Sequence, residues 1–225
     1  MIKAIVTDIE GTTTDIDFVH KVLFPYSTER LPDFVRQHAG ESKVSAALAE
    51  AAYAAGIPGD DIEGLITALL QWIAEDRKIT PLKTLQGLIW EHGYKSGDFH
   101  AHIYPDAVDV LQQWQRQKRA LYVYSSGSTF AQKLLFGHTE AGDLRGLFSD
   151  YFDTTTGNKR DAASYRSIVR SIDLPATHIA FLSDVVEELD AATQAGMTTV
   201  WVQRQGELQH RSPHLSVRDF SEIDF

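Results

Sequence analysis

The chain of 225 residues contains no cysteine. This absence excludes disulfide bridges, thiolate metal sites and a cysteine nucleophile. No stretch approaches the roughly 20 consecutive apolar residues that a membrane-spanning helix needs. The apolar stretch at the N-terminus is too short for a signal peptide, and acidic residues follow it directly. We therefore expect a protein of a reducing compartment, with the cytoplasm as its location and without membrane association.

Positive charge is scarce, because 21 Lys and Arg residues face 31 Asp and Glu residues and leave a net charge of -10. Such a surface repels phosphate backbones, so we expect no nucleic-acid partner. It also lacks a polybasic segment for anionic lipids. An enzyme that binds a small phosphorylated substrate would need a local positive centre, such as a metal ion with one lysine. The lack of a long exposed apolar run favours a monomer.

The hydrophobic content of 43% is sufficient for one large domain, or for a domain with an insert. Four short, almost entirely apolar runs are typical of strands that are covered on both faces of a parallel sheet. Amphipathic helical patterns lie between the later runs. The alternation predicts an α/β fold with a doubly wound, mainly parallel, Rossmann-like sheet. The four runs are residues 2–7, 120–124, 178–182 and 198–202.

Residues 15–102 follow a different pattern, because apolar residues recur there at helical spacing and no strand-like run interrupts them. The clearest helix is expected over residues 60–76. We therefore predict an all-helical cap domain, residues 15–102, inserted after the first strand. The α/β core domain would consist of residues 1–14 and 103–225, and the cap would close over its ligand site.

Ligands of open α/β sheets bind at the carboxyl ends of the strands. Here those ends carry carboxylates, hydroxyls and a glycine-containing turn, and a lysine precedes a later helix. A carboxylate can attack phosphorus, hard oxygen ligands can hold Mg²⁺, and a lysine can offset the charge of the transferred group. The set therefore favours magnesium-dependent phosphoryl transfer through an aspartyl phosphate. Its members are Asp8, Glu10, Thr12, Ser125, Ser126, Lys159 and Asp184.

The order of these motifs resembles that of the haloacid dehalogenase superfamily of phosphatases. The first motif is DIEGTT, the second is the strand end YVYSS, the third is Lys159 and the fourth is SDVVEELDAATQAG. Each motif alone is weak, because an aspartate after a strand often only caps a turn and a lone lysine is usually solvated. Their order and spacing together are a strong signal. The resemblance implies a haloacid dehalogenase-like core and Mg²⁺ as the cofactor.

Three longer segments are similar to the enolase-phosphatases, or acireductone synthases, of methionine salvage: DIEGTTTDIDFVHKVLFPY, ITPLKTLQGLIW and VYSSGSTFAQKLLFGHTEAGDL. The resemblance extends from residue 2 to about residue 202. It implies an enzyme that enolises and then dephosphorylates 2,3-diketo-5-methylthiopentyl-1-phosphate, a small phosphorylated metabolite.

The resemblance also implies roles for individual residues. Asp8 would be the nucleophile and a magnesium ligand. Glu10 would bind the metal through its backbone carbonyl, and its side chain would act as general acid and then as general base. Ser125 and Ser126 would bind substrate oxygens through their hydroxyl and amide groups. Thr12 would help to position the phosphate.

Four further roles follow from the same resemblance. Lys159 would hold the phosphate and shield the charge of the nucleophile. Asp184 would be a side-chain ligand of Mg²⁺, and Glu188 would be a second acid that orients the metal or its waters. Lys83, in the TPLKTLQG segment, would reach the substrate from the cap.

Two other interpretations stay open on the sequence alone. The chain could be a phosphatase or phosphomutase of the same superfamily that acts on another small phosphorylated metabolite. It could also be a non-catalytic phosphate-binding module, although this would require a broken motif and none is visible. His100 and His102 are interpreted as loop histidines, because no third metal ligand has matching spacing.

Overall fold

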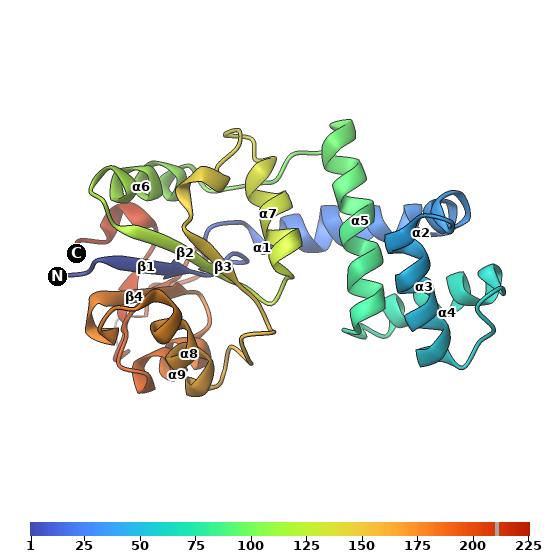
Figure 1. Cartoon of the computed structure of the whole chain (residues 1–225). Coiled ribbons are helices and arrows are strands. Elements are labelled where there is room, and N and C mark those ends of the chain that lie inside the picture. Colours follow the sequence, from blue (N-terminus) through green and yellow to red (C-terminus); the bar gives the residue numbers. More distant parts are fainter. Residues whose placement is uncertain (210–211) are drawn as a thin grey trace. The chain divides into compact units, whose positions relative to one another are not determined.

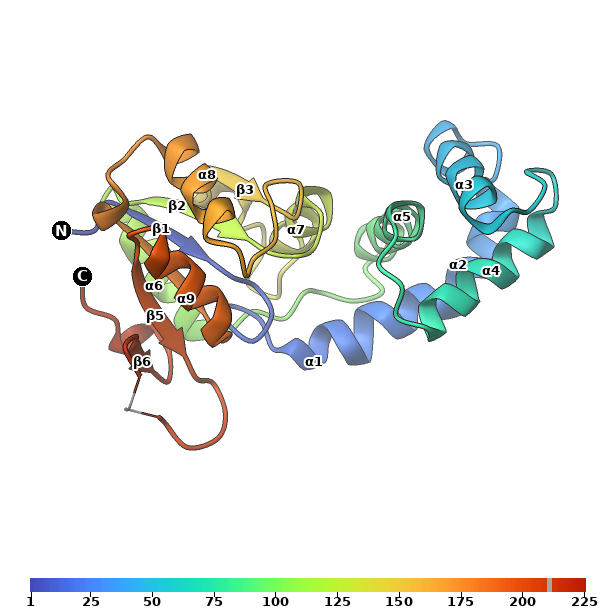
Figure 2. The same cartoon turned by 90° about the horizontal axis from the view of Figure 1, so that it is seen from below.

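The computed structural model describes residues 1–209 and 212–225 and divides into two compact units. One unit contains residues 1–16 and 100–225, and the other contains residues 17–99. Figures 1 and 2 show the first unit as an α/β fold and the second as a set of helices.

The α/β unit is built on a six-stranded sheet in the order β3-β2-β1-β4-β5-β6, and every neighbouring pair is parallel. Valine, isoleucine, tyrosine and phenylalanine dominate the central strands, as the covering of both faces requires. The strands are β1 (Ala4–Thr7), β2 (Ala120–Tyr124), β3 (Asp150–Phe152), β4 (Ile179–Ser183), β5 (Thr198–Val202) and β6 (Leu215–Val217).

Helices cover both faces of this sheet (Figure 1). Helices α8 (Ala162–Ile172) and α9 (Val186–Gln194) pack on one face, where their apolar side chains join those of β1 and β4 in one buried cluster. Helix α6 (Pro105–Arg116) lies on the other face, and α7 (Thr129–Gly137) contacts β3. The prediction of a doubly wound α/β fold is thereby confirmed.

The position of β1 explains where a ligand site forms. β1 lies between β2 and β4, and the chain proceeds to one edge of the sheet through β2 and to the other through β4. The carboxyl ends of β1 and β4 therefore flank the point at which the strand order reverses. Open α/β sheets bind their ligands in the crevice at this point.

The helical unit contains its own buried cluster of leucine, isoleucine, valine and alanine side chains. Asp61 caps the N-terminus of one helix, because its carboxylate accepts a hydrogen bond of 2.9 Å from the amide of Gly64. The elements, counted from the connection at Ile16, are α1 (Ile16–Phe18), a π-helical turn (Val19–Leu23), α2 (Phe24–His38), α3 (Ser42–Ala55), α4 (Ile62–Ala74) and α5 (Thr80–Ser96). The prediction of a helical insert after the first strand is confirmed.

The two connections that enter and leave the insert meet within the α/β unit. The Thr14 hydroxyl donates a hydrogen bond of 2.9 Å to the backbone carbonyl of His102. The amide of Asp15 donates one of 3.0 Å to Nδ1 of the His102 ring. His102 is thus a loop histidine that joins the ends of the insertion.

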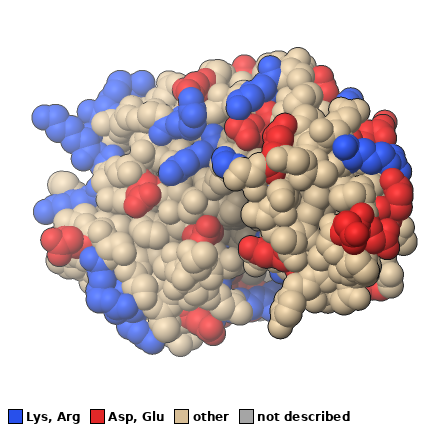
Figure 3. Space-filling view, turned by 45° about the vertical axis from the view of Figure 1, so that its right-hand side comes forward, with Lys and Arg blue, Asp and Glu red and all other residues tan. Residues whose placement is uncertain are grey.

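Charged side chains of both signs lie on the surface of the molecule. Figure 3 shows basic and acidic side chains together across the face in view, rather than a wholly basic surface. In the part of the chain that the structure describes, the helices lack the combination of length and apolarity needed to traverse a bilayer.

Candidate active site

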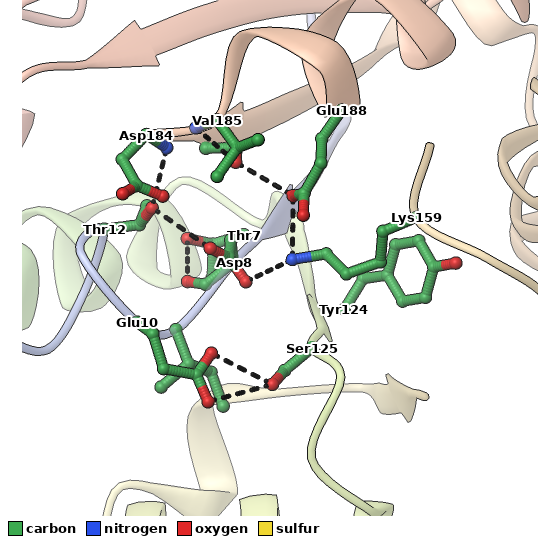
Figure 4. Close-up of polar contacts among 12 residues, drawn as sticks. Thr7, Asp8, Glu10, Thr12, Tyr124, Ser125, Lys159, Asp184, Val185 and Glu188 are labelled. Atoms are coloured by element: carbon green, nitrogen blue, oxygen red, sulfur yellow. Dashed lines mark hydrogen bonds and ion pairs between the residues drawn. The ribbon is translucent and has the colours of Figure 1, made fainter. Parts of the chain in front are cut away.

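Asp8 follows β1 at the carboxyl edge of the sheet. Its amide donates to the carbonyl of Leu182 at 2.9 Å and so extends the pairing of β1 with β4 by one residue. The residue is 2% exposed. A buried carboxylate needs compensation, which Lys159 supplies, because Nζ lies 2.5 Å from Oδ1 of Asp8 (Figure 4). The pair presents a fixed carboxylate with a cation at its side.

Lys159 is itself held between two carboxylates, since Nζ also lies 2.8 Å from Oε2 of Glu188. Burial acts to lower the pKa of Lys159, but the negative charges of Asp8 and Glu188 raise that pKa by more, so the net shift is upward. The backbone carbonyl of Lys159 accepts a hydrogen bond of 2.7 Å from the buried Tyr165 hydroxyl. Lys159 therefore stays charged and in place at neutral pH.

A tight loop follows the nucleophile candidate. The carbonyl of Ile9 accepts hydrogen bonds from three amides, those of Thr12, Thr13 and Thr14, at 2.9 to 3.2 Å. The loop turns at Gly11, whose φ of +74° favours glycine. A Cβ atom at Gly11 would lie 2.3 Å from Oδ2 of Asp184, so the backbone also needs glycine for its close approach to that carboxylate.

Glu10 points to the end of the neighbouring strand β2. The Ser125 hydroxyl lies 3.1 Å from Oε2 and 3.4 Å from Oε1 of Glu10. Burial raises the pKa of Glu10, and the negative charge of Asp8 raises it further. This environment favours a carboxyl group that can hold a proton and release it, as a general acid does. Ser125 is fully buried, whereas Ser126 is exposed.

Asp184 follows β4, and its surroundings show whether the site fits a metal ion. Its Oδ1 is buried without a hydrogen-bond partner among the described residues. Burial, followed by the charge of Asp8, raises the pKa of Asp184 to about 6. A divalent cation beside Asp8 and Asp184 would bind the free Oδ1 as a ligand. It would also stabilise the ionised forms of both carboxylates. The donor set is all oxygen, which suits Mg²⁺.

A complete cage of side chains is absent from the described ranges, since no group of three or more His, Asp or Glu side chains there has a metal-binding arrangement. A magnesium ion at this site would instead keep several waters and use few protein ligands. The predicted backbone ligand, the carbonyl of Glu10, belongs to this kind of site. The metal ligands stay predictions.

Of three further predicted residues, Glu188 and Thr12 lie beside Asp8 and Lys159, and Lys83 lies in the helical unit. The carboxylate of Glu188 accepts a hydrogen bond of 3.0 Å from the Ser183 hydroxyl and pairs with Lys159, and burial, then the charge of Asp8, raises its pKa to about 7. The fully buried Thr12 hydroxyl lies 3.5 Å from Oδ2 of Asp8 and accepts from the Asp184 amide at 3.1 Å. Lys83 lies on α5 in the helical unit. Metal contact by Glu188 and substrate contact by Thr12 and Lys83 stay predictions.

One residue beside this site was not predicted. Arg204 lies two residues beyond β5 and donates through Nε and Nη2 to the backbone carbonyl of Thr12. The sequence signal was available, because the strand-end rule applied to residues 2–7, 120–124 and 178–182 also applies to residues 198–202. The sequence does not say, however, which backbone carbonyl an arginine will bind.

Comparisons with known proteins agree with this geometry. The sequence profile of the haloacid dehalogenase-like hydrolases matches residues 2–196. Enolase-phosphatase E1 of Pseudomonas aeruginosa (strain LESB58) is 56% identical over 222 residues, which cover 99% of this chain and 98% of that protein.

Solved structures give the same result. The UTR4 protein of Saccharomyces cerevisiae superposes with a TM-score of 0.85 at 35% identity, and the match covers 99% of this chain and all of that one. The putative HAD-hydrolase YfnB of Bacillus subtilis, solved bound to magnesium, has a TM-score of 0.62 at 15% identity over 98% of this chain and 96% of that one, which shows the shared fold alone. The chain therefore belongs to the haloacid dehalogenase-like hydrolases, and among them to the enolase-phosphatase E1 family.

Proposed function

We propose that this protein is a magnesium-dependent enolase-phosphatase that converts 2,3-diketo-5-methylthiopentyl-1-phosphate into the corresponding acireductone in one active site. The observation that carries the proposal is the buried pair of Asp8 and Lys159 beside Glu10. Burial raises the pKa of the Glu10 carboxyl group. The three side chains would supply a nucleophile, a fixed cation and a general acid at one strand edge. The full-length similarity to enolase-phosphatase E1 supports this substrate.

The phosphate step uses Asp8 and Glu10. A carboxylate oxygen of Asp8 attacks phosphorus, the bond from phosphorus to the ester oxygen breaks, and the leaving oxygen takes a proton from Glu10. The ionised Glu10 then removes a proton from water, which attacks the aspartyl phosphate. The bond from phosphorus to Asp8 breaks and releases inorganic phosphate. Lys159 offsets negative charge throughout, because it stays protonated between its two carboxylates.

The enolisation step needs a base that removes a carbon-bound proton, while the ketone oxygen takes a second proton from solvent water. We propose Glu10 as this base. An ionised Glu10 that accepts the proton becomes the carboxylic acid that the phosphate step requires. After hydrolysis, Glu10 releases to solvent the proton that it took from water and is ionised again. The order of the two steps thus follows from the protonation state of the Glu10 side chain. The Ser125 hydroxyl, 3.1 Å from Oε2, keeps that side chain at the strand edge.

Mg²⁺ would be held by the side chains of Asp8 and Asp184 and by the backbone carbonyl of Glu10. When bound, it supplies a Lewis acid for a carbonyl oxygen and for phosphate oxygens. The unpartnered Oδ1 of Asp184 supports its presence. Ser125, Ser126 and Lys159 would bind the phosphate, Glu188 would orient the metal or its waters, and Thr12 and Lys83 would make further substrate contacts.

The working form follows from these assignments. The substrate is a small phosphorylated metabolite, so the protein needs no nucleic-acid or membrane partner. We propose a cytoplasmic monomer, whose mass in solution can be checked by light scattering.

The test is anaerobic turnover of the diketone phosphate with Mg²⁺ and then with a chelator, with enol absorbance and free phosphate followed together. We expect an enol signal that precedes or accompanies magnesium-dependent phosphate release. Phosphate release from other esters alone would instead support a phosphatase or phosphomutase with a different metabolite. A protein that binds phosphate but turns over no ester would be a non-catalytic module.

A further inference from the structure

The side chain of Arg204 is 9% exposed, and its donors are directed to two fixed acceptors. Nε and Nη2 donate to the backbone carbonyl of Thr12 at 3.0 and 2.8 Å. Nη1 lies 2.8 Å from each carboxylate oxygen of Asp106, at the start of α6. A planar guanidinium that binds two acceptors in this way fixes their relative positions.

Two aromatic rings hold the plane of the guanidinium. The carbon Cζ of Arg204 lies 4.1 Å from the centroid of the Tyr104 ring and 5.2 Å from that of Phe220. The carboxylate of Asp106 also accepts a hydrogen bond of 2.9 Å from the Phe220 amide. The position of Arg204 is therefore determined by α6 and the C-terminal segment, which lie outside the loop that it binds.

The peptide group that Arg204 holds belongs to a residue that contacts the carboxylate of Asp8 and the backbone amide of Asp184. The Thr12 hydroxyl lies 3.5 Å from Oδ2 of Asp8 and accepts from the Asp184 amide at 3.1 Å (Figure 4). The side chain of Thr12 is fully buried, so it cannot move without displacing its neighbours. A shift of this peptide would reach the nucleophile and the metal-side aspartate together.

From these contacts we infer that Arg204 is a positioning residue for the phosphoryl-transfer loop. It binds the carbonyl of Thr12 and so keeps Asp8 and Asp184 in the reactive arrangement. The inference rests on the proposed function, because it takes Asp8 as the nucleophile. By this inference the end of β5 contributes a residue to the reaction, as the ends of β1, β2 and β4 do in the proposed function.

The expected kinetic signature follows from what Arg204 contacts. Its partners are Thr12, Asp106 and two rings, whereas Lys159 and Ser125 remain in place to bind phosphate when Arg204 is replaced. A misplacement on the order of 1 Å can cost about 100-fold in rate. We expect Arg204→Met to lower kcat by about 10- to 100-fold and to change KM by less than about threefold.

The experiment measures kcat and KM for an aryl phosphate, with Mg²⁺, in the full-length protein. Arg204→Met leaves the carboxylate of Asp106 without its cation and can impair folding. The double variant Arg204→Met/Asp106→Asn removes that charge and should fold, yet should keep the loss in kcat. Arg204→Lys keeps the charge but lacks the planar guanidinium that donates to two acceptors at once, so it should recover kcat only in part.

Arg119 provides a matched control in the same unit. Its Nη2 donates to the Phe225 carbonyl at 2.5 Å and its Cζ lies 5.7 Å from the Phe225 ring, so it ties the C-terminal segment without touching the loop. Arg119→Met should keep the wild-type kcat. An equal loss in Arg119→Met, or a wild-type kcat in the folded double variant, overturns the inference and leaves the proposed function intact. A wild-type protein without phosphatase activity overturns both.

Discussion

At the residue scale, Lys159 is the buried cation on which the site depends. Its Nζ lies 2.5 Å from Oδ1 of Asp8 and 2.8 Å from Oε2 of Glu188, and the residue is 8% exposed. Two buried carboxylates without this cation would repel each other, and one would take up a proton. Asp8, the proposed nucleophile, would then be protonated part of the time and would attack phosphorus less often.

We predict that Lys159→Met lowers kcat/KM by about 10²- to 10³-fold, which is the typical cost of removing one fixed donor from a developing anion. Steady-state turnover of an aryl phosphate measures this loss, and circular dichroism checks the fold. Lys133→Met is the control, because Nζ of Lys133 lies 5.4 Å from the Tyr151 ring and contributes to a surface contact instead. A Lys159→Met protein with wild-type kinetics would remove this lysine from the site.

Much of the candidate site could be read from the sequence at this scale. Asp8, Ser125 and Asp184 each follow an apolar run, and parallel strands bring such positions to one edge. The contact between Lys159 and Glu188 could not be predicted, since it depends on how the loop before α8 lies over α9. Arg204 was missed because its acceptor is a backbone carbonyl, which every residue carries.

At the scale of elements, the loop after β1 is shaped by one glycine. Gly11 has a φ of +74°, and a Cβ there would lie 2.3 Å from Oδ2 of Asp184. An alanine would carry two separate costs. One is the strain of the left-handed backbone, about 1–2 kcal/mol, and the other is a collision with the carboxylate of Asp184.

Gly97 allows these two costs to be separated. It has the same φ of +74°, ends α5, and has open space where a Cβ would lie. We predict that Gly97→Ala loses only the backbone cost in its free energy of unfolding in urea, about 1–2 kcal/mol, and that Gly11→Ala loses more. Only Gly11→Ala should lose about tenfold or more in kcat and need more Mg²⁺ for half-maximal activity. Equal kcat values in the two variants would contradict the assigned contact with Asp184.

Elements were predictable where their pattern was long or fully apolar. β1, β2, β4 and β5 were expected from their apolar runs, and the helix expected over residues 60–76 is α4. β3 and β6 have no apolar run that predicts a strand at their positions. Each has three residues, and one end of each is exposed, so neither produces the continuous apolar run of a buried strand.

At the scale of the whole molecule, each unit has a hydrophobic cluster of its own. The cluster of the helical unit includes Leu69 and Leu85, and that of the α/β unit includes Ile168 and Phe181. Among the residues that the structure describes, none belongs to both clusters. Loss of packing in one cluster should therefore weaken mainly the unit that contains it.

We predict that Leu69→Ala, at a fully buried position of α4, costs about 2–5 kcal/mol in the helical unit. Native-state hydrogen exchange should show lost protection in α2 to α5 and retained protection in β1 and β4. Ile168→Ala, at a fully buried position of α8, is the reciprocal control and should give the opposite pattern. Uniform loss of protection along the chain in both variants would show that the two units unfold as one.

The central position of β1 has a consequence for the order of synthesis. Ala4 pairs with Ala120 and with Ile179, so the first strand to leave the ribosome must wait for partners made much later. At roughly 5 to 20 residues per second, the wait lasts roughly 6 to 35 s, and during it the backbone groups at both edges of β1 are unpaired. The elements between residues 17 and 99 are consecutive and need no later segment for their own cluster. The ribosome thus completes the helical unit before the sheet can begin to close, and a nascent chain that stalls before residue 120 would expose β1 to chaperones.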